Sequence, residues 1–282
     1  MPTPFSDGEI DTAAIRRNVA RFVESGLGGV VALGTNGEAA MLDDDESDRV
    51  LEAARERVPA EKALIAGVGR ESTRATIAAA HRAAAAGADA VLVRTPSFYR
   101  AHIAVPALVA HYTAIADESR VPVLLYNYAG FTGVNLSPDT IGRLAAHPNI
   151  VGLKETSTDG AQFAELAAAV PADFTVMAGS APGVYAALCA GATGAILAVA
   201  CVRPALCLAL LEHVRAGRFA EALACQQRMT PLARAVTTGY GIAGLKAAMD
   251  LSGMDGGDPR PPIGALAPEG MEKIRGLLDA TH

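Results

Sequence analysis

Short apolar runs alternate with longer stretches of mixed polarity along the first two hundred residues. The apolar runs are rich in β-branched residues and predict strands at 30–33, 64–68, 90–94, 123–126, 151–154, 175–178 and 195–199. Each run is almost continuously apolar, which is typical of strands that are covered on both faces. Strands of this kind, separated by helical segments, indicate a parallel sheet built from βα units.

The segments between these runs predict amphipathic helices, and several begin with a residue that caps a helix. The predicted helices are 12–25, 46–57, 72–86, 105–118, 138–147 and 161–169. Asp11 precedes the first, Ser72 opens the third, and Ser137 followed by proline opens the fifth. Gly26 and Gly87 stand just after two of them, where a helix commonly ends.

The spacing of these units predicts a closed (β/α)8 TIM barrel. Seven units of roughly 30 residues fill most of the ~250 residues that this fold occupies. An eighth strand is needed for closure, and only residues 2–5 are available for it. After Val202 the pattern is wholly helical, at 205–216, 220–229, 242–251 and 268–280. We therefore expect a barrel over residues 1–216 and a C-terminal helical region over 217–282.

Composition narrows the class of partner. The chain has 282 residues and a net charge of −6, which argues against nucleic acid or an anionic membrane as its main partner. Its four cysteines lack paired spacing, and its six histidines lack a metal-binding pattern, so we expect reduced thiols and no metal site. The uncharged stretch 181–202 is interrupted by glycine and proline, which favours a buried helix and strand over a membrane span. The first ten residues do not resemble a signal peptide, and we expect a cytoplasmic protein.

Ionisable and hydroxyl side chains stand at the ends of three predicted strands. Lys154 ends one apolar run, Tyr126 ends the run before it, and Thr35 and Asn36 follow the first run on a glycine-flanked turn. Parallel strands bring their carboxyl ends to one side of a sheet, so these residues are expected to share a pocket suited to carbonyl chemistry.

Each of these residues has a second interpretation. Burial would lower the pKa of Lys154 and make its amine a nucleophile for a ketone, but the lysine could instead reach the rim or pair with Glu155. Tyr126 could carry protons for that amine or simply cap the core. Thr35 and Asn36 could bind a carboxylate through N–H and hydroxyl groups or form an ordinary turn.

Together these residues form motifs that resemble the pyruvate-dependent class I aldolases. The motifs are GTNGEA at 34–39, LLYN at 124–127 and GLKE at 152–155. The family includes dihydrodipicolinate synthase and N-acetylneuraminate lyase, and within it the chain most resembles 4-hydroxy-2-oxoglutarate aldolase. Longer stretches carry that likeness, namely AGVGREST at 66–73, AHYTAIAD at 110–117, HPNIVGLKE at 147–155, MAGSA at 177–181 and GIAGLKAAMD at 241–250.

The resemblance implies a role for each motif residue. Lys154 would form a Schiff base with the keto carbon of a 2-oxo acid, and Tyr126 would relay protons together with Thr35. Thr35 and Asn36 would hold the substrate carboxylate. Three further positions, Gly179, Ile196 and Thr156, would line the pyruvate end of the site. The resemblance also implies a homotetramer built as a dimer of dimers, and chemistry that needs neither a metal nor an organic cofactor.

The chain departs from the family pattern in three places. The first strand is unusually short. Phe131 stands where the synthase carries an arginine for a distal carboxylate, and Arg94 is a candidate replacement that could equally pair with an acid at the rim. Phe98 stands where a relay tyrosine is expected, with Tyr99 beside it. Tyr99 could take over the relay, or the relay could end in water or in the substrate.

The sequence therefore predicts a class I aldolase that cleaves a 4-hydroxy-2-oxo acid to pyruvate and an aldehyde. One alternative is a dihydrodipicolinate synthase, or a 2-keto-3-deoxy sugar acid aldolase or dehydratase, that uses the same lysine imine. An alternative of another class is a barrel that binds an oxo acid without catalysis. The intact pair of Lys154 and Tyr126 favours an enzyme, whereas the change at position 98 leaves the non-catalytic alternative open.

Overall fold

The computed structural model describes residues 1–281 and separates into two compact units. The first unit comprises Met1–Leu64 and the chain from Leu197 onward, and the second comprises Ile65–Ile196. Seven strands follow one another in chain order, namely β3 (Gly29–Ala32), β4 (Ala63–Gly67), β5 (Ala90–Arg94), β6 (Val123–Asn127), β7 (Ile150–Glu155), β8 (Thr175–Ala178) and β9 (Gly194–Ala195).

The parallel pairing predicted from the apolar runs is confirmed from β4 to β9. The sheet is covered on both sides, because consecutive residues of β5, which point to opposite faces, are almost wholly inaccessible. Polar residues in β5, β6 and β7 are confined to the last one or two positions of each strand. The core of the sheet is therefore apolar, and its chemistry is concentrated at the carboxyl ends of its strands.

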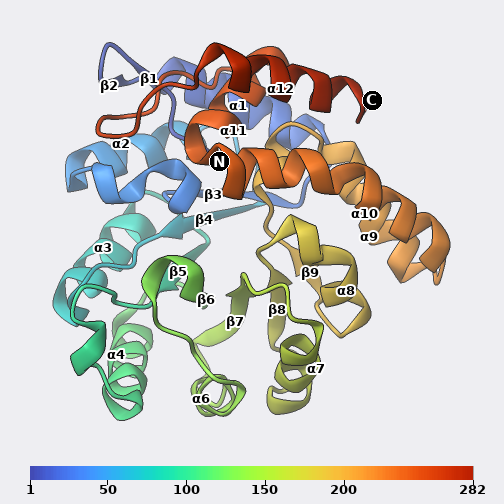
Figure 1. Cartoon of the computed structure of the whole chain (residues 1–282). Helices are drawn as coiled ribbons and strands as arrows, with labels where there is room; N and C mark the ends of the chain where they lie inside the picture. The colour runs from blue at the N-terminus through green and yellow to red at the C-terminus, as the bar shows by residue number, and fades with distance from the viewer. Residues whose placement is uncertain (282) are drawn as a thin grey trace. The chain divides into compact units, whose positions relative to one another are not determined.

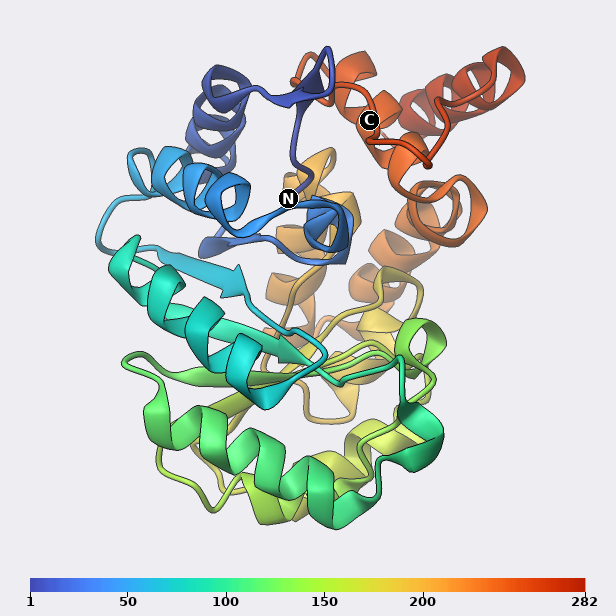
Figure 2. The ribbon, with the colours of Figure 1, turned by 90° about the vertical axis from the view of Figure 1, so that its left-hand side faces the viewer.

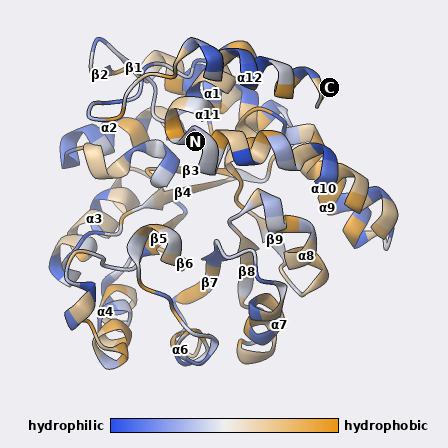
Figure 3. Cartoon of the chain, in the orientation of Figure 1, coloured by the Kyte–Doolittle hydropathy of each residue, from blue (hydrophilic) through white to orange (hydrophobic). Residues whose placement is uncertain are grey.

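Helices connect the strands of the second unit and pack outside them (Figure 1). They are α3 (Thr73–Ala85), α4 (Val105–Glu118), α6 (Pro138–Leu144), α7 (Gly160–Ala169) and α8 (Val184–Cys189). Short helical turns occupy three of the loops, namely η3 (Arg100–His102), α5 (Ala129–Thr132) and η4 (Ala181–Gly183). Figure 2 shows α3 and α4 running alongside each other. Apolar and polar residues both occur along these helices, as helices that pack on one side require (Figure 3).

The first unit contains the remaining helices, and its part after Val202 is wholly helical, as predicted. Before the break in the unit come α1 (Thr12–Glu24), η1 (Thr35–Gly37), η2 (Ala39–Met41) and α2 (Asp44–Arg55). After it come η5 (Ala198–Cys201), α9 (Pro204–Arg215), α10 (Phe219–Arg234), η6 (Ala235–Gly239), α11 (Gly241–Leu251) and α12 (Pro268–Asp279). Helix α10 extends past the predicted end at residue 229 to Arg234 and includes Pro231, and the chain then continues as the π-helical turn η6.

The predicted capping residues act as caps. The side chains of Asp11, Ser72 and Ser137 each accept a hydrogen bond from a backbone N–H in the first turn of the helix that follows. Gly26 and Gly87 both have a φ of +87°, the left-handed conformation that ends a helix at low cost only for glycine.

The expected eighth strand at residues 2–5 is wrong. Phe5–Ser6 instead forms a short antiparallel ribbon (β1) with Glu9–Ile10 (β2). Pro2 and Pro4 have no N–H to donate to a ladder, so residues 2–5 cannot pair regularly with a neighbouring strand. The segment is held in other ways, since the N-terminal ammonium donates to the carbonyl of Val31 and the Thr3 hydroxyl donates to the carbonyl of Gly37.

The strand predicted at 195–199 is shorter than expected. Only Gly194–Ala195 is assigned as β9, and the N–H of Ile196 continues the ladder by donating to the carbonyl of Ala178 at 2.9 Å. Beyond it the chain turns into η5, where N–H groups bond to carbonyls three residues back and are no longer available to a sheet. Within residues 1–281, no helix combines the length and apolar character that crossing a membrane requires.

Candidate active site

Lys154 and Tyr126 are neighbours across two adjacent strands. The register of β6 and β7 pairs these two residues directly, and it pairs Asn127 with Glu155 at the next position. The Lys154 Nζ atom lies 4.3 Å from the centroid of the Tyr126 ring. Both side chains are buried. The amine and the phenol expected to act together are therefore in contact.

The Lys154 amine is buried, and no carboxylate among the described residues stabilises its charged form. Loss of solvent lowers the pKa of Lys154 to about 8. Within residues 1–281, no carboxylate forms an ion pair with its Nζ atom, and its recorded polar contact is the face of the Tyr126 ring. Near neutral pH the unprotonated amine, which is the form that attacks a carbonyl carbon, is therefore much more abundant than in an exposed lysine.

Glu155 does not pair with Lys154, although it is the next residue. Neighbouring residues of a strand point to opposite faces, and the Glu155 carboxylate binds three N–H donors away from the amine. One oxygen accepts from the side chains of Asn127 (2.7 Å) and Gln162 (2.9 Å), and the other accepts from the Ser157 N–H (2.7 Å). Burial raises the pKa of Glu155, while these hydrogen bonds oppose the shift. The carboxylate thus joins the ends of β6 and β7 to the start of α7.

Gly179 and Thr156 pack directly against the lysine. The Gly179 N–H donates to the carbonyl of Glu155 at 2.6 Å. A Cβ atom at Gly179 would lie 3.0 Å from the Lys154 Cε atom and 2.5 Å from the Thr156 hydroxyl oxygen. That hydroxyl is buried without a hydrogen-bond partner among the described residues. Gly179 therefore faces both an unused buried hydroxyl and the Lys154 side chain, in a space that a larger residue at 179 would fill.

The other expected binding residues occupy separate places. Ile196 follows β9 in the second unit and bonds to the end of β8 through its N–H. Thr35 and Asn36 belong to the first unit, where they form the short helix η1 after β3. Their turn is fixed by Glu38, which has a left-handed φ of 55° and whose carboxylate is bound by Lys246 and by the N–H of Arg260.

The three aromatic residues that depart from the family pattern lie on loops of the second unit and are strongly exposed. Phe98 and Tyr99 meet edge to face at 4.9 Å between ring centroids, and Phe131 meets Tyr128 edge to face at 4.6 Å. The ring centroid of Tyr128 in turn lies 5.9 Å from that of Tyr126. The sequence analysis overlooked Tyr128, although its position two residues after Tyr126 places it on the same face of an extended chain.

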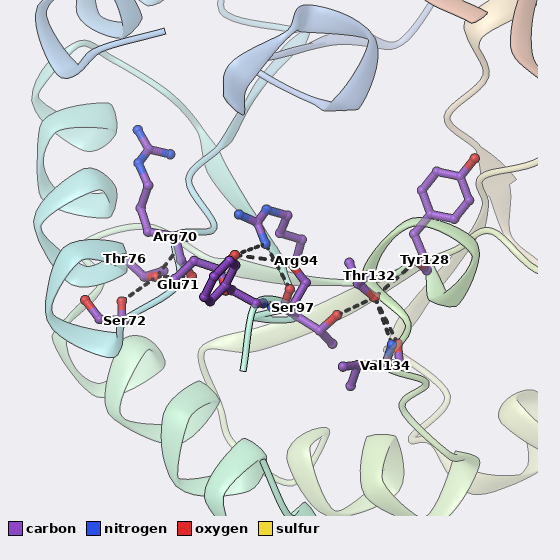
Figure 4. A network of polar contacts seen from close by, with 11 residues as sticks. Arg70, Glu71, Ser72, Thr76, Arg94, Ser97, Tyr128, Thr132 and Val134 are labelled. Carbon is purple, nitrogen blue, oxygen red and sulfur yellow. Dashed lines mark hydrogen bonds and ion pairs between the residues drawn. The ribbon is translucent and has the colours of Figure 1, made fainter. Parts of the chain in front are cut away.

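Arg94 is engaged by an acid that the sequence analysis also overlooked. Figure 4 shows Arg94 and Ser97 converging on Glu71, which follows β4. Glu71 accepts hydrogen bonds from Arg94 and from the N–H groups of Ser97 and Phe98, each at 2.9 Å. Partial burial raises the pKa of Glu71, but these bonds outweigh it and hold the pKa at about 2. This geometry matches the alternative in which Arg94 pairs with an acid at the rim.

The comparison with family models decides the relationship. Residues 1–281 match the model of the dihydrodipicolinate synthetase family. The chain belongs to that family. Members of this family are pyruvate-dependent lyases and aldolases, and the chain is therefore an enzyme that acts on carbon–carbon bonds. Among residues 1–281, no group of three His, Cys, Asp or Glu side chains is arranged to hold a metal.

Relatives with two different activities are similar to the chain. It is 33% identical over 280 residues to a 4-hydroxy-tetrahydrodipicolinate synthase of Exiguobacterium, covering 99% of this chain and 95% of that one. It is 36% identical over 273 residues to a protein of Emericella nidulans named as a probable mitochondrial 4-hydroxy-2-oxoglutarate aldolase, covering 94% and 87%. Both the aldolase and the synthase interpretations are therefore consistent with the family.

Solved structures of the family share the fold. The dihydrodipicolinate synthase of Thermotoga maritima superposes with a TM-score of 0.95 at 29% identity, covering 100% of this chain and 96% of that one. The enzyme of Aquifex aeolicus gives 0.94 at 27% identity, covering 99% and 95%. The chain accordingly has the TIM-barrel fold of this family with a C-terminal helical part, as the sequence predicted.

Proposed function

We propose that the chain is a class I aldolase that cleaves a 4-hydroxy-2-oxo acid, such as 4-hydroxy-2-oxoglutarate, through a Schiff base on Lys154. The observation that carries the proposal is the buried Lys154 amine, which has no acid partner among the described residues and lies against the Tyr126 ring. Members of a family of pyruvate-dependent lyases need a nucleophile of this kind.

The first stage forms the imine. The unprotonated amine attacks the keto carbon, the carbonyl electron pair moves to oxygen, and Tyr126 donates a proton to that oxygen. Tyr126 then accepts a proton from the new ammonium group. When Tyr126 donates again, the hydroxyl leaves as water while the nitrogen lone pair forms the C=N bond. A single phenol can serve each of these transfers because it alternates between donor and acceptor.

The second stage breaks the carbon–carbon bond. The protonated imine withdraws electrons, so loss of the proton from the 4-hydroxyl group lets the bond between C3 and C4 cleave into an aldehyde and an enamine. Protonation of the enamine at C3 and hydrolysis of the imine then release pyruvate and the free lysine. Thr35 and Asn36 would bind the carboxylate, and Gly179, Thr156 and Ile196 would line the pyruvate end. No metal or organic cofactor is required, since the imine holds the electrons.

The residue at position 131 weakens the synthase interpretation, and it equally weakens any substrate with a second carboxylate, 4-hydroxy-2-oxoglutarate included. Phe131 is exposed and apolar, so it cannot form an ion pair with the distal carboxylate of an aspartate semialdehyde. The synthase remains the second candidate, because relatives at 33–39% identity carry that name. Both candidate reactions proceed through the imine of Lys154. They differ only in the reaction partner of the enamine carbon.

The exposed aromatic pair supports an assembly of several copies. Phe98 and Tyr99 are 76% and 65% exposed, and a second copy of the chain would cover them in the homotetramer that is typical of the family. Light scattering after size exclusion should give four times the mass of the chain. Replacing both residues by serine should lower this mass.

We also propose a cytoplasmic location, because all four cysteines are free thiols. Cell fractionation tests this location.

Borohydride trapping tests the proposed function most directly. Reduction in the presence of pyruvate should add one stable pyruvyl group, and the modified peptide should contain Lys154. A panel of 4-hydroxy-2-oxo acids, and pyruvate paired with candidate aldehydes, should then identify the cleaved substrate. Trapping without turnover of any member of the panel would favour the non-catalytic oxo-acid-binding barrel. Failure to trap any 2-oxo acid would contradict the proposal.

A further inference from the structure

Three aromatic rings extend outward from the lysine. The Lys154 Nζ atom lies on the Tyr126 ring, Tyr126 lies 5.9 Å from Tyr128 at an interplanar angle of 34°, and Phe131 meets Tyr128 edge to face at 4.6 Å. All four residues belong to the second unit. Tyr126 and Tyr128 are on the same face because they are two positions apart on extended backbone. A second phenol is therefore placed beside the proton carrier of the proposed reaction.

The Tyr128 hydroxyl is available to exchange protons. Tyr128 is half-buried, and no other residue within 1–281 forms a hydrogen bond with its hydroxyl. In Figure 4 the hydroxyl points away from the cluster of Thr132 and Val134 beneath it. Burial raises the pKa of Tyr128, and its electrostatic interaction with Tyr126 raises it further, so the side chain stays protonated and able to donate at neutral pH.

The backbone and the neighbouring ring fix Tyr128 in place. Its carbonyl accepts hydrogen bonds from the N–H groups of Phe131 and Thr132, both at 3.0 Å, and from the Thr132 hydroxyl at 3.2 Å. The same hydroxyl oxygen accepts from the Thr95 side chain at 2.8 Å. These bonds tie the segment after β6 to the end of β5. A proton transfer group needs such a fixed position, because transfer requires short and repeated contact.

The two residues considered for this role from the sequence are less suitable within one chain. Phe98 has no hydroxyl group. Tyr99 is 65% exposed, and its ring packs on Phe98. Phe131 is explained by the same arrangement, since its ring supports Tyr128 from the outside. Phe131 then has a different role from the arginine expected at this position. Its ring stabilises Tyr128, whereas the arginine would bind a carboxylate.

We propose that Tyr128 is a further hydroxyl group of the proton relay and passes protons between Tyr126 and water. After Tyr126 has given its proton to the carbinolamine oxygen, Tyr128 donates a proton to the Tyr126 phenolate and regains one from solvent. The reverse sequence removes the proton that Tyr126 takes from the substrate. No electrons or atoms other than protons are exchanged. Tyr128 acts through Tyr126, and this inference rests on the proposed Schiff-base function.

The test compares Tyr128→Phe with the wild-type enzyme, with Tyr99→Phe as the rival relay residue, and with Tyr240→Phe at an exposed tyrosine of the first unit as the matched control. Tyr128→Phe keeps the ring contacts and removes only the hydroxyl. We expect the rate of borohydride trapping with pyruvate, and kcat for 4-hydroxy-2-oxoglutarate, to fall roughly 10- to 100-fold with KM unchanged, because water substitutes poorly for a positioned group. Tyr240→Phe, which also loses one tyrosine hydroxyl, should change neither rate by more than about twofold.

Chemical rescue separates a relay role from a structural one. Small general acids such as imidazole buffer should raise the rate of Tyr128→Phe in proportion to their concentration and should leave the wild-type rate unchanged. Tyr128→His, which supplies another proton-transfer group, should retain more activity than Tyr128→Phe. These results together would support the relay.

Three outcomes would overturn the inference. An unchanged rate in Tyr128→Phe, or a loss that buffer and histidine both fail to rescue, rejects Tyr128 while leaving trapping on Lys154, and hence the proposed function, in place. A loss in Tyr99→Phe with none in Tyr128→Phe assigns the relay to Tyr99. If the wild-type enzyme traps no 2-oxo acid, the proposed function fails and this inference fails with it.

Discussion

Two buried lysines of this chain share burial and an aromatic neighbour but differ in their charge environment. Lys154 in the second unit is 8% exposed and lies 4.3 Å from the centroid of Tyr126. Lys246 in the first unit is 1% exposed and lies 4.5 Å from the centroid of Phe5. Lys246 forms an ion pair with Glu38 at 2.5 Å and donates to the carbonyl of Asp258 at 2.7 Å. Lys154 has neither kind of partner among the described residues.

The difference identifies which lysine can be a nucleophile. Burial lowers the pKa of both amines, but Glu38 opposes the shift at Lys246 by stabilising the ammonium form. An ammonium held by a carboxylate and a carbonyl has no free electron pair for a ketone. A buried lysine is therefore a candidate for Schiff-base chemistry when no acid accompanies it, and a structural residue when one does. The following predictions test this distinction, from the largest expected effect to the smallest.

Lys154→Ala should abolish both borohydride trapping and turnover, because the chain would lose its only proposed nucleophile. Mass analysis of the reduced protein checks the first effect, and a pyruvate-release assay checks the second. Lys62→Ala is the control, since Lys62 donates to the carbonyl of Leu27 and should be dispensable. An adduct that maps to Lys246 or Lys62 would show that the absence of an acid partner does not identify the nucleophilic lysine.

Tyr126→Phe should lower kcat by roughly 10²–10⁴, the usual contribution of a positioned acid–base group, and should leave the fold intact. The phenyl ring preserves the contact with Lys154 and with Tyr128, so only proton transfer is lost. Steady-state kinetics and circular dichroism measure the two properties. Equal activity of variant and wild type would show that Tyr126 only packs in the core and does not transfer protons.

Lys246→Met should reduce the free energy of unfolding by about 3–5 kcal/mol, because it leaves the buried Glu38 carboxylate without its ion-pair partner. The double variant with Glu38→Gln should recover part of that loss, since no charge is then buried alone. Urea unfolding measures both. If Lys246→Met were as stable as the wild type, the pair would not have the structural role assigned to it.

The rate of trapping should depend on pH through the Lys154 amine. The protonated form cannot attack, so the rate should rise about tenfold per pH unit below the pKa of about 8 and should level off above it. Initial rates of pyruvate trapping between pH 5.5 and 9.5, corrected for borohydride decay, provide this profile. A rate that keeps rising to the usual pKa of an exposed lysine would mean that Lys154 is not desolvated.

Arg94→Ala should have the smallest effect. Its partner Glu71 is substantially exposed, and exposed pairs contribute about 0–1 kcal/mol, so the free energy of unfolding should change by no more than that. The KM for 4-hydroxy-2-oxoglutarate should stay within about twofold, because the guanidinium is already bound to Glu71. A rise of tenfold or more would instead assign the distal carboxylate to Arg94.

The predicted active-site residues were accessible from the sequence because their signal is local. An apolar run that ends in Lys154 or Tyr126 indicates a strand end. Because the carboxyl ends of parallel strands lie on one side of the sheet, these residues are expected to lie together. The contact between these two residues is found in the structure. Glu71 carried no comparable signal, since its partners Arg94, Ser97 and Phe98 are identified only when loops from different strands are placed in space. Tyr128 carried a local signal, its spacing of two from Tyr126, that the sequence analysis did not use. The catalytic roles of Lys154 and Tyr126, the roles of Thr35, Asn36, Gly179, Ile196 and Thr156, and the domain boundary at residue 216 all stay predictions.

The sequence by itself determined the alternation of strands and helices, the capped helix starts and the family, because each depends on short-range patterning or on whole motifs. Only the tertiary structure decided which charges meet. Register and the opposite facing of adjacent residues separate Lys154 from Glu155, whereas the fold brings Glu38 to Lys246 from a distant part of the chain. Prolines at 2 and 4 removed a predicted strand for the same reason: pairing needs donors and partners that a single segment cannot supply.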